Sequence, residues 1–242
     1  RQAEHNDRVA AVVLHVNSPG GDAFASDLMW REVLRVGKQK PVVVAMGDVA
    51  ASGGYYIAAP AAAIVAQPAT LTGSIGVISL RPVLAGMLER AGINTVVLSR
   101  GAHSGLFSVT EPLNDDERQA LRAQIFATYD DFKQRVRAGR GLTEGDLEPI
   151  AGGRVWSGAD ALERGLVDQL GGMPEALIRA QELANLPQDR EAPIMVLRGR
   201  REWSPPKPFP TGDSILAMLD MLHDTARTRV WAVLPFWTGD VP

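Results

Sequence analysis

Residues 41–56 read Pro-Val-Val-Val-Ala-Met-Gly-Asp-Val-Ala-Ala-Ser-Gly-Gly-Tyr-Tyr, an apolar run followed by one serine among small residues. The apolar run predicts a strand, and the small residues after it predict a tight turn into a helix. Because no bulky side chain flanks Ser52, a substrate backbone can approach its hydroxyl closely. The amide of Gly53, at the start of the helix, can point at a developing negative charge. This stretch therefore predicts a nucleophilic serine.

A second strand-like run precedes this one. Residues 12–16 are mostly apolar and are followed at 17–21 by Asn-Ser-Pro-Gly-Gly. Binding sites of open α/β sheets form at the carboxyl ends of the strands, so we expect both turns at the same sheet edge. The amide of Gly20 or Gly21 can then complete an oxyanion hole with Gly53. Each turn taken alone also fits a packing turn of a nucleotide-binding or other α/β domain.

Predicted strands and helices alternate along most of the chain. Apolar runs predict strands near 10–16, 41–46, 62–66 and 94–98. Apolar spacing predicts helices near 22–36, 52–59 and 82–91. Further helices are predicted at 114–138, after a capping Thr143, and at 158–163 and 174–186. We therefore expect an α/β fold with a mostly parallel sheet covered by helices.

The composition changes after Pro187. Residues 203–210 contain four prolines, and an apolar helical pattern resumes from about residue 213. The proline stretch predicts an extended connector. We expect a serine-bearing domain at 1–186 and, at 187–242, a connector with a helical carboxyl-terminal arm. The apolar run 230–237 is too short to span a bilayer and fits either an arm on another subunit or a membrane-surface anchor.

Composition and charge exclude several classes of protein. With 242 residues and 45% hydrophobic content, the chain can bury a sizeable core. A net charge of -3 argues against a nucleic-acid surface. The chain contains no cysteine, and its histidines show no ligand spacing, so we expect no metal site and no cofactor.

Four motifs stand in order along the chain, at 16–21, 50–57, 71–77, and 153–158 with 165–168. Together they resemble the signal peptide peptidase A family, whose serine/lysine proteases are related in fold to the Clp protease and crotonase groups. The resemblance implies that Ser52 is the nucleophile and that the amides of Gly53 and Gly20 are the oxyanion donors. It also implies that Ser74 supplies a hydroxyl that orients the catalytic lysine. Thr72 and Ser74 equally fit a tight turn in which their hydroxyls bind backbone groups.

The lysine that the family requires is missing from its usual place. A lysine can take the proton of a serine hydroxyl only if burial keeps it neutral. In short members of the family this lysine follows a Gly-Ala-His tripeptide, but here Ser104 follows residues 101–103. The polar surroundings of all four lysines predict solvated surface charges: Lys38, Lys40, Lys133 and Lys207. We therefore expect the base to come from outside this chain.

The long, duplicated members of the family offer a source for this base, because their amino-terminal half carries the lysine and their carboxyl-terminal half the serine. Arg1 is not an initiator methionine, and the first predicted strand begins soon after it. We therefore expect this chain to be the carboxyl-terminal half of such a protein. The lysine would come from the homologous amino-terminal half or from a neighbouring subunit of a homo-oligomer.

A histidine base is the competing interpretation. His15 lies within a predicted strand, where we expect a packed core histidine. His103 lies in a loop that borders the active site in the family, so a Ser52/His103 pair with Asp48 or Asp115 stays open.

The resemblance implies an oligomeric serine endopeptidase that degrades short apolar peptides, such as the remnants of cleaved signal peptides. It places the protein at the extracytoplasmic face of a bacterial cytoplasmic membrane, with the anchor outside this chain. Two other functions stay open. The first is a catalytically silent, protease-like scaffold subunit that lacks its base. The second is a crotonase-like acyl-CoA enzyme, against which the serine in the glycine turn and the Thr-Gly-Ser segment both count.

Overall fold

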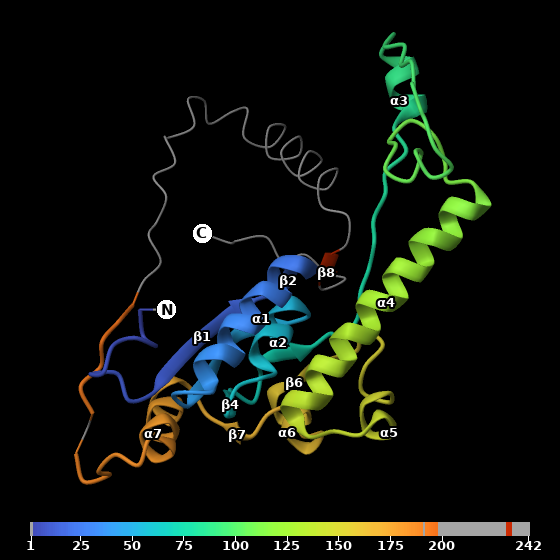
Figure 1. The fold of residues 1–242 in the computed structure, drawn as a ribbon. Helices are drawn as coiled ribbons and strands as arrows, with labels where there is room; N and C mark the ends of the chain where they lie inside the picture. Colours follow the sequence, from blue (N-terminus) through green and yellow to red (C-terminus); the bar gives the residue numbers. More distant parts are fainter. Residues whose placement is uncertain (1, 191, 198–230, 234–242) are drawn as a thin grey trace. The chain divides into compact units, whose positions relative to one another are not determined.

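The computed structural model describes residues 2–190, 192–197 and 231–233 (Figure 1). The described chain divides into two compact units. The first comprises residues 2–79, 122–190 and 231–233, and the second comprises residues 80–121 and 192–197. The domain boundary predicted near residue 187 stays a prediction, because most of the connector and helical arm lie outside the described residues.

The first unit is built on a six-stranded sheet centred on β3 (Val42–Ala51). β3 pairs in parallel with β1 (Val12–Ser18), β4 (Ala63–Ala66) and β5 (Leu71–Gly73). β7 (Gln169–Leu170) pairs in parallel with β4, and β6 (Val155–Ser157) pairs antiparallel with β5. The predicted α/β fold with a mostly parallel sheet is confirmed.

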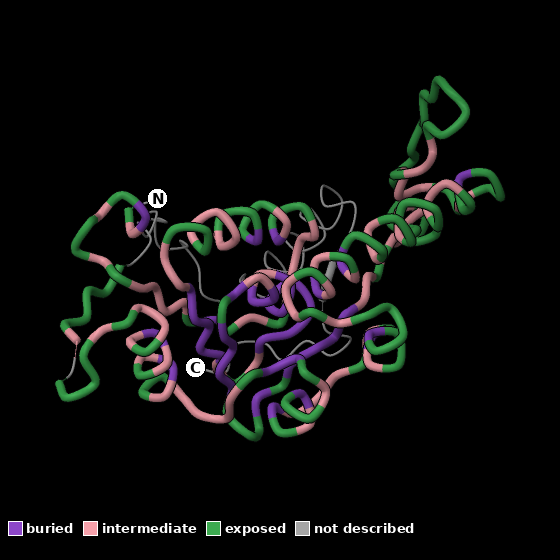
Figure 2. The backbone as a smooth tube through the Cα atoms, turned by 60° about the horizontal axis from the view of Figure 1, so that its bottom comes forward, coloured by how far each residue is buried: buried purple, intermediate pink, exposed green. Residues whose placement is uncertain are grey.

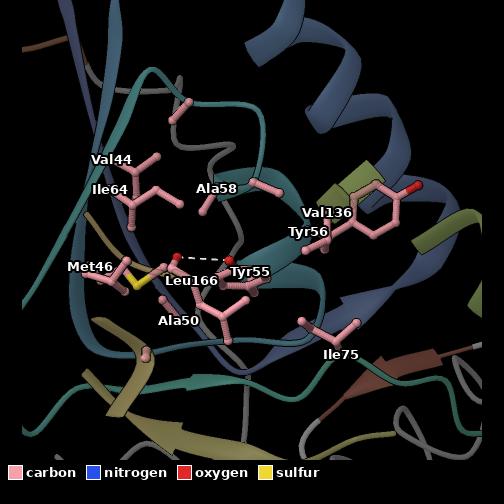
Figure 3. Close-up of a cluster of buried hydrophobic side chains, with 14 of the residues drawn as sticks. Val44, Met46, Ala50, Tyr55, Tyr56, Ala58, Ile64, Ile75, Val136 and Leu166 are labelled. Atoms are coloured by element: carbon pink, nitrogen blue, oxygen red, sulfur yellow. Dashed lines mark hydrogen bonds between the residues drawn. The ribbon is translucent and has the colours of Figure 1, made fainter. Parts of the chain in front are cut away.

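Helices cover both faces of this sheet, which explains why the start of β3 is continuously apolar. Val44 and Met46 belong to one buried cluster with side chains of α2 (Gly53–Ala58) and α4 (Asp115–Arg140), shown in Figure 3, and with Trp30 of α1 (Ala23–Gly37). Val43 and Ala45 belong to a second cluster, together with Ala176 and other residues of α7 (Met173–Leu183). Figure 2 shows the buried segments gathered in the strands between these helices. The alternating side chains of β3 thus pack into two separate helix layers.

The helices of the described residues begin and end close to the predicted positions. Their bounds are α1 Ala23–Gly37, α2 Gly53–Ala58, α3 Ala85–Arg90, α4 Asp115–Arg140, α5 Glu144–Leu147, α6 Gly158–Glu163 and α7 Met173–Leu183. The predicted cap at Thr143 is confirmed, because its side chain accepts from the amide of Asp146 in a capping box. Asp22 caps α1 through a single hydrogen bond, because its side chain accepts from the amide of Ala25 at 2.7 Å. No helix within the described ranges is long and apolar enough to cross a membrane.

Two expectations about individual segments are wrong. The predicted strand at 94–98 is neither helix nor strand, and its Val96 and Leu98 side chains are 85% and 95% exposed. A β-branched sequence forms a strand only where a neighbouring strand binds its backbone, and none does so in the part of the chain that is described. His15 is exposed instead of packed in the core. Among the described strands, β1 pairs with β3 alone, so His15 lies at an edge of the sheet.

A two-stranded ribbon lies at the end of β1. β2 (Gly20–Asp22) pairs antiparallel with β8 (Trp231–Val233), with Gly21 opposite Ala232. β8 belongs to the apolar run 230–237, and the other residues of that run lie outside the described residues. The edge of the glycine-rich turn therefore binds an extended backbone segment.

Candidate active site

Ser52 occupies a strained turn between β3 and α2. β3 ends at Ala51 and α2 begins at Gly53, as the sequence predicts. The backbone of Ser52 has φ 52° and ψ -118°, a region that L-residues rarely adopt and that is common at functional sites. Its side chain is fully buried, and its Oγ has no hydrogen-bond partner among the described residues. A buried hydroxyl without a partner is costly, which points to a role other than stability.

The two glycine-rich turns meet at Gly53. A Cβ atom placed on Gly53 would lie 3.2 Å from the nitrogen of Gly21 and 3.3 Å from the Cα of Gly20. The same atom would lie 2.5 Å from the Oγ of Ser26, one turn into α1. Gly54 faces the carbonyl oxygen of Ser18, which is 2.6 Å from its Cβ position. Only glycine at these positions lets the backbones approach so closely.

Asn17 links the first turn to β3. Its Oδ1 accepts from the amide of Val49 at 3.2 Å, and its side chain lies against Gly47, where a Cβ would come within 2.8 Å. Sequence reasoning missed both Asn17 and Ser26. The signal was present at Gly47, because a glycine inside a strand marks the close approach of another group.

The amides of the first turn differ in their present partners. Gly20 has φ 114°, and its amide donates to the Oγ of Ser18 at 3.2 Å. The amide nitrogen of Gly21 lies 3.2 Å from the point where a Cβ of residue 53 would be. The structure therefore places Gly20, Gly21 and Gly53 together, with one of the three amides engaged by a side chain.

Ser74 lies beside Ser52 in the sheet register. β5 pairs Gly73 with Ala51, and the amide of Ser52 donates to the carbonyl oxygen of Gly73 at 2.9 Å. Ser74 is the next residue; it is buried, with φ 49°, and its amide donates to the carbonyl oxygen of Arg154 at 2.7 Å. Ser52 and Ser74 are thus two buried serines with positive φ, and each directly follows one of two adjacent strands.

Thr72, in contrast, fits the alternative in which its hydroxyl binds a backbone group. Its hydroxyl donates to the carbonyl oxygen of Ala50 at 2.7 Å, and the residue is fully buried. This hydrogen bond joins β5 to β3 two residues before each of the two serines.

None of the lysines in the described chain is suited to act as the base for Ser52. The ammonium of Lys40 donates to the carbonyl oxygens of Ala3 and Asn6, each at 2.8 Å. Lys38 is exposed, and both residues precede β3, whereas Ser52 follows it. The ten residues of β3 separate the two ends by roughly 30 Å.

Lys133 is held in its charged form. Its ammonium hydrogen-bonds Glu144 and Glu148, each at 3.1 Å, and lies 3.4 Å from Asp130. The hydrogen bond that Lys133 donates to Glu144, followed by the one to Glu148, raises the pKa of Lys133. A base for serine needs the opposite shift. Lys207 lies outside the described residues.

The competing histidine and metal interpretations gain no support from these contacts. His103 is exposed in the unit of residues 80–121, and Asp48 is exposed at the end of β3. Among the residues described, no three His, Asp or Glu side chains come together as metal ligands.

A buried, strained serine at a strand-to-helix turn, next to glycine amides at a helix start, is the arrangement of a serine hydrolase on an α/β sheet. Comparison with known families agrees with this class. The model of peptidase family S49 matches residues 35–187, which include Ser52, Gly53 and Ser74. The chain belongs to peptidase family S49.

Several named relatives resemble the chain over most of its length. It is 41% identical over 198 residues to the chloroplastic serine protease SPPA of Arabidopsis thaliana, covering 81% of this chain and 29% of that protein. It is 36% identical over 230 residues to protease 4 of Haemophilus influenzae, covering 94% and 35%. A putative signal peptide peptidase SppA of Enterococcus faecium is 34% identical, with 73% and 52% covered. The chain thus spans about a third of the first two relatives.

Among solved structures, a ClpP1 mutant from Listeria monocytogenes matches with a TM-score of 0.44 and 15% identity. The match covers 69% of this chain and 76% of that one.

Proposed function

We propose that this chain is the serine-bearing part of a serine/lysine endopeptidase in which Ser52 is the nucleophile. The observation that carries the proposal is the buried Oγ of Ser52, which has no hydrogen-bond partner in the described part of the chain and lies on a strained turn beside the glycines of two converging turns. Membership of peptidase family S49 supports the same reaction.

The reaction is acyl transfer to Ser52. Its Oγ attacks the carbonyl carbon of a peptide bond while its proton passes to a neutral lysine. The carbonyl oxygen becomes an oxyanion, which accepts hydrogen bonds from the amide of Gly53 and an amide of the Gly20–Gly21 turn. The C–N bond then breaks, and the lysine returns the proton to the leaving amine. Water hydrolyses the resulting ester and regenerates Ser52.

The lysine comes from a homologous amino-terminal half or from a neighbouring subunit of a homo-oligomer. Lys40 and Lys133 already donate hydrogen bonds to other groups, and this supports an outside source for the base. So does the length of the relatives, about two thirds of which lie beyond the matched region. Ser74 orients the amino group of the incoming lysine. The hydrolysis rate of the assembled protein should rise with pH, because only the deprotonated lysine accepts the proton of Ser52.

The substrates are short, extended, apolar peptides such as cleaved signal peptides. The binding of β8 along β2 supports an extended substrate, because the same edge can bind a peptide strand through its backbone. The name of the Enterococcus faecium relative supports signal peptides as the source. This substrate places the protein at the extracytoplasmic face of a bacterial cytoplasmic membrane.

The test is hydrolysis of an apolar peptide by the chain mixed with a lysine-bearing amino-terminal half. We expect the chain alone to be inactive and the mixture to be active. Ser52→Ala should abolish the activity of the mixture, whereas Ser99→Ala, at an exposed serine of the second unit, should leave it unchanged. A folded wild-type mixture without hydrolysis would favour the silent scaffold. Activity of the chain alone that is lost on His103→Ala would favour the histidine base.

A further inference from the structure

A hydrogen bond joins the two helices that begin at or just after the proposed oxyanion donors. α1 follows the Gly20–Gly21 turn, and α2 starts at Gly53. About one turn into each helix, the hydroxyl of Tyr56 on α2 donates to the Oδ1 of Asp27 on α1 at 3.0 Å.

Asp27 is itself held firmly. The Nε of Arg31 donates to its Oδ2 at 2.6 Å, and the Nε of Arg135 on α4 lies 3.5 Å from its Oδ1. Arg135 in turn stacks over the ring of Trp30, 4.3 Å from the ring centre. Burial opposes ionisation of Asp27, but the hydrogen bonds from Arg31 and Tyr56 outweigh it and lower the pKa of its carboxyl. The acceptor for Tyr56 is therefore a fixed carboxylate.

Tyr56 is equally constrained. Tyr56 is buried, and the centre of its ring lies 4.8 Å from the ring centre of Phe132 on α4. Tyr56 and Val136 belong to the same buried cluster, and Figure 3 shows the Tyr56 hydroxyl directed away from that cluster. Burial, and then the hydrogen bond to Asp27, raises the pKa of Tyr56 to about 12, so the hydroxyl keeps its proton.

We infer that Asp27 is a positioning residue: through Tyr56 it sets the separation between the amide of Gly53 and the amides of the Gly20–Gly21 turn. Two contacts act in opposite directions on this separation. The Oγ of Ser26 lies against Gly53 and limits how closely the helix starts approach. The Asp27–Tyr56 hydrogen bond limits how far they move apart. This inference rests on the proposed function, because the separation matters only if both turns bind one oxyanion.

The kinetic test compares two substitutions on the same helix. Tyr56→Phe removes the hydrogen bond to α1, whereas Tyr55→Phe removes a bond of similar length, 2.9 Å, to the carbonyl oxygen of Leu166. In the mixture with the amino-terminal half, we expect Tyr56→Phe to lower kcat about tenfold with KM within about twofold, because a loosened oxyanion hole affects the transition state. Tyr55→Phe should lower stability without this kcat effect. Equal kcat losses in the two variants would overturn the inference.

A conservative variant and a spectroscopic readout complete the test. Asp27→Asn keeps an acceptor for Tyr56 and should retain most of the kcat that Asp27→Ala loses. In NMR spectra of the chain alone, Tyr56→Phe should shift the amide signals of both Gly53 and Gly21, whereas Tyr55→Phe should leave Gly21 unchanged. Unchanged signals of both glycines in Tyr56→Phe would refute the positioning role, whether or not the mixture hydrolyses peptide. Absence of Ser52-dependent hydrolysis would instead refute the proposed function.

Discussion

Gly53→Ala tests the close approach of the two turns. The added Cβ would lie 2.5 Å from the Oγ of Ser26 and 3.2 Å from the nitrogen of Gly21. Restoring an ordinary van der Waals contact with Ser26 requires a movement of about 0.9 Å. Because both contacts lie on the side of the first turn, this movement separates the amides that donate hydrogen bonds to the oxyanion.

The expected loss follows from this displacement. A misplacement of about 1 Å at a catalytic group costs on the order of 100-fold in rate, so we expect kcat of the assembled enzyme to fall by about that factor. Overpacking should also lower the free energy of unfolding by about 1–3 kcal/mol. The assays are peptide hydrolysis by the mixture with the amino-terminal half and urea unfolding of the chain.

Ser26→Ala is the matched second substitution. It removes the nearest clashing atom, together with the hydrogen bond that its hydroxyl donates to the carbonyl oxygen of Asp22 at 2.9 Å. The double variant Gly53→Ala/Ser26→Ala should recover part of both losses, which makes the two substitutions non-additive. Wild-type kcat in Gly53→Ala, or strictly additive effects in the double variant, would refute the argument that this contact sets the spacing of the turns.

Three further predictions follow from single contacts. Tyr55→Phe leaves the buried carbonyl oxygen of Leu166 without its donor and should lower the free energy of unfolding in urea by about 1–3 kcal/mol; an unchanged midpoint would contradict this. Ser74→Ala should lower kcat of the mixture at least about tenfold, because the lysine becomes charged as it takes the proton of Ser52 and a hydrogen bond to a charged group is worth about that factor. Full activity of this variant would remove Ser74 from the mechanism. The hydroxyl of Ser157 donates to Asp160 at 2.6 Å and lowers its pKa, so this contribution to stability is present above about pH 4 and is lost as the pH falls through the lowered pKa. Urea unfolding between pH 3 and pH 7 should therefore depend less steeply on pH in Ser157→Ala.

The parts of the fold that could be predicted from the sequence are those with long patterns. The buried start of β3 is a continuous apolar run, and its end at Ser52 is marked by small residues, so both were predictable. β2, β5, β6 and β7 have only two or three residues each, too few for a periodic signal. Their existence depends on partners distant in the sequence.

The polar part of the site was less predictable, because it depends on contacts between elements. Phe24 and Leu28 suggest the apolar face of α1, yet they are exposed, and α1 buries Ser26 and Trp30 instead. The helix packs against Gly53 at the start of α2, where only a small side chain such as that of Ser26 fits. No periodicity of α1 alone contains this information.

The central claim is that Ser52 forms the acyl intermediate, and trapping that intermediate tests it most directly. The assembled protein would be quenched in acid during turnover of an apolar peptide ester, digested, and analysed by mass spectrometry. We predict that the acyl group is found on the peptide that contains Ser52 and is absent from the Ser52→Ala protein. An acyl group on another residue, or turnover by Ser52→Ala at the wild-type rate, would contradict this account.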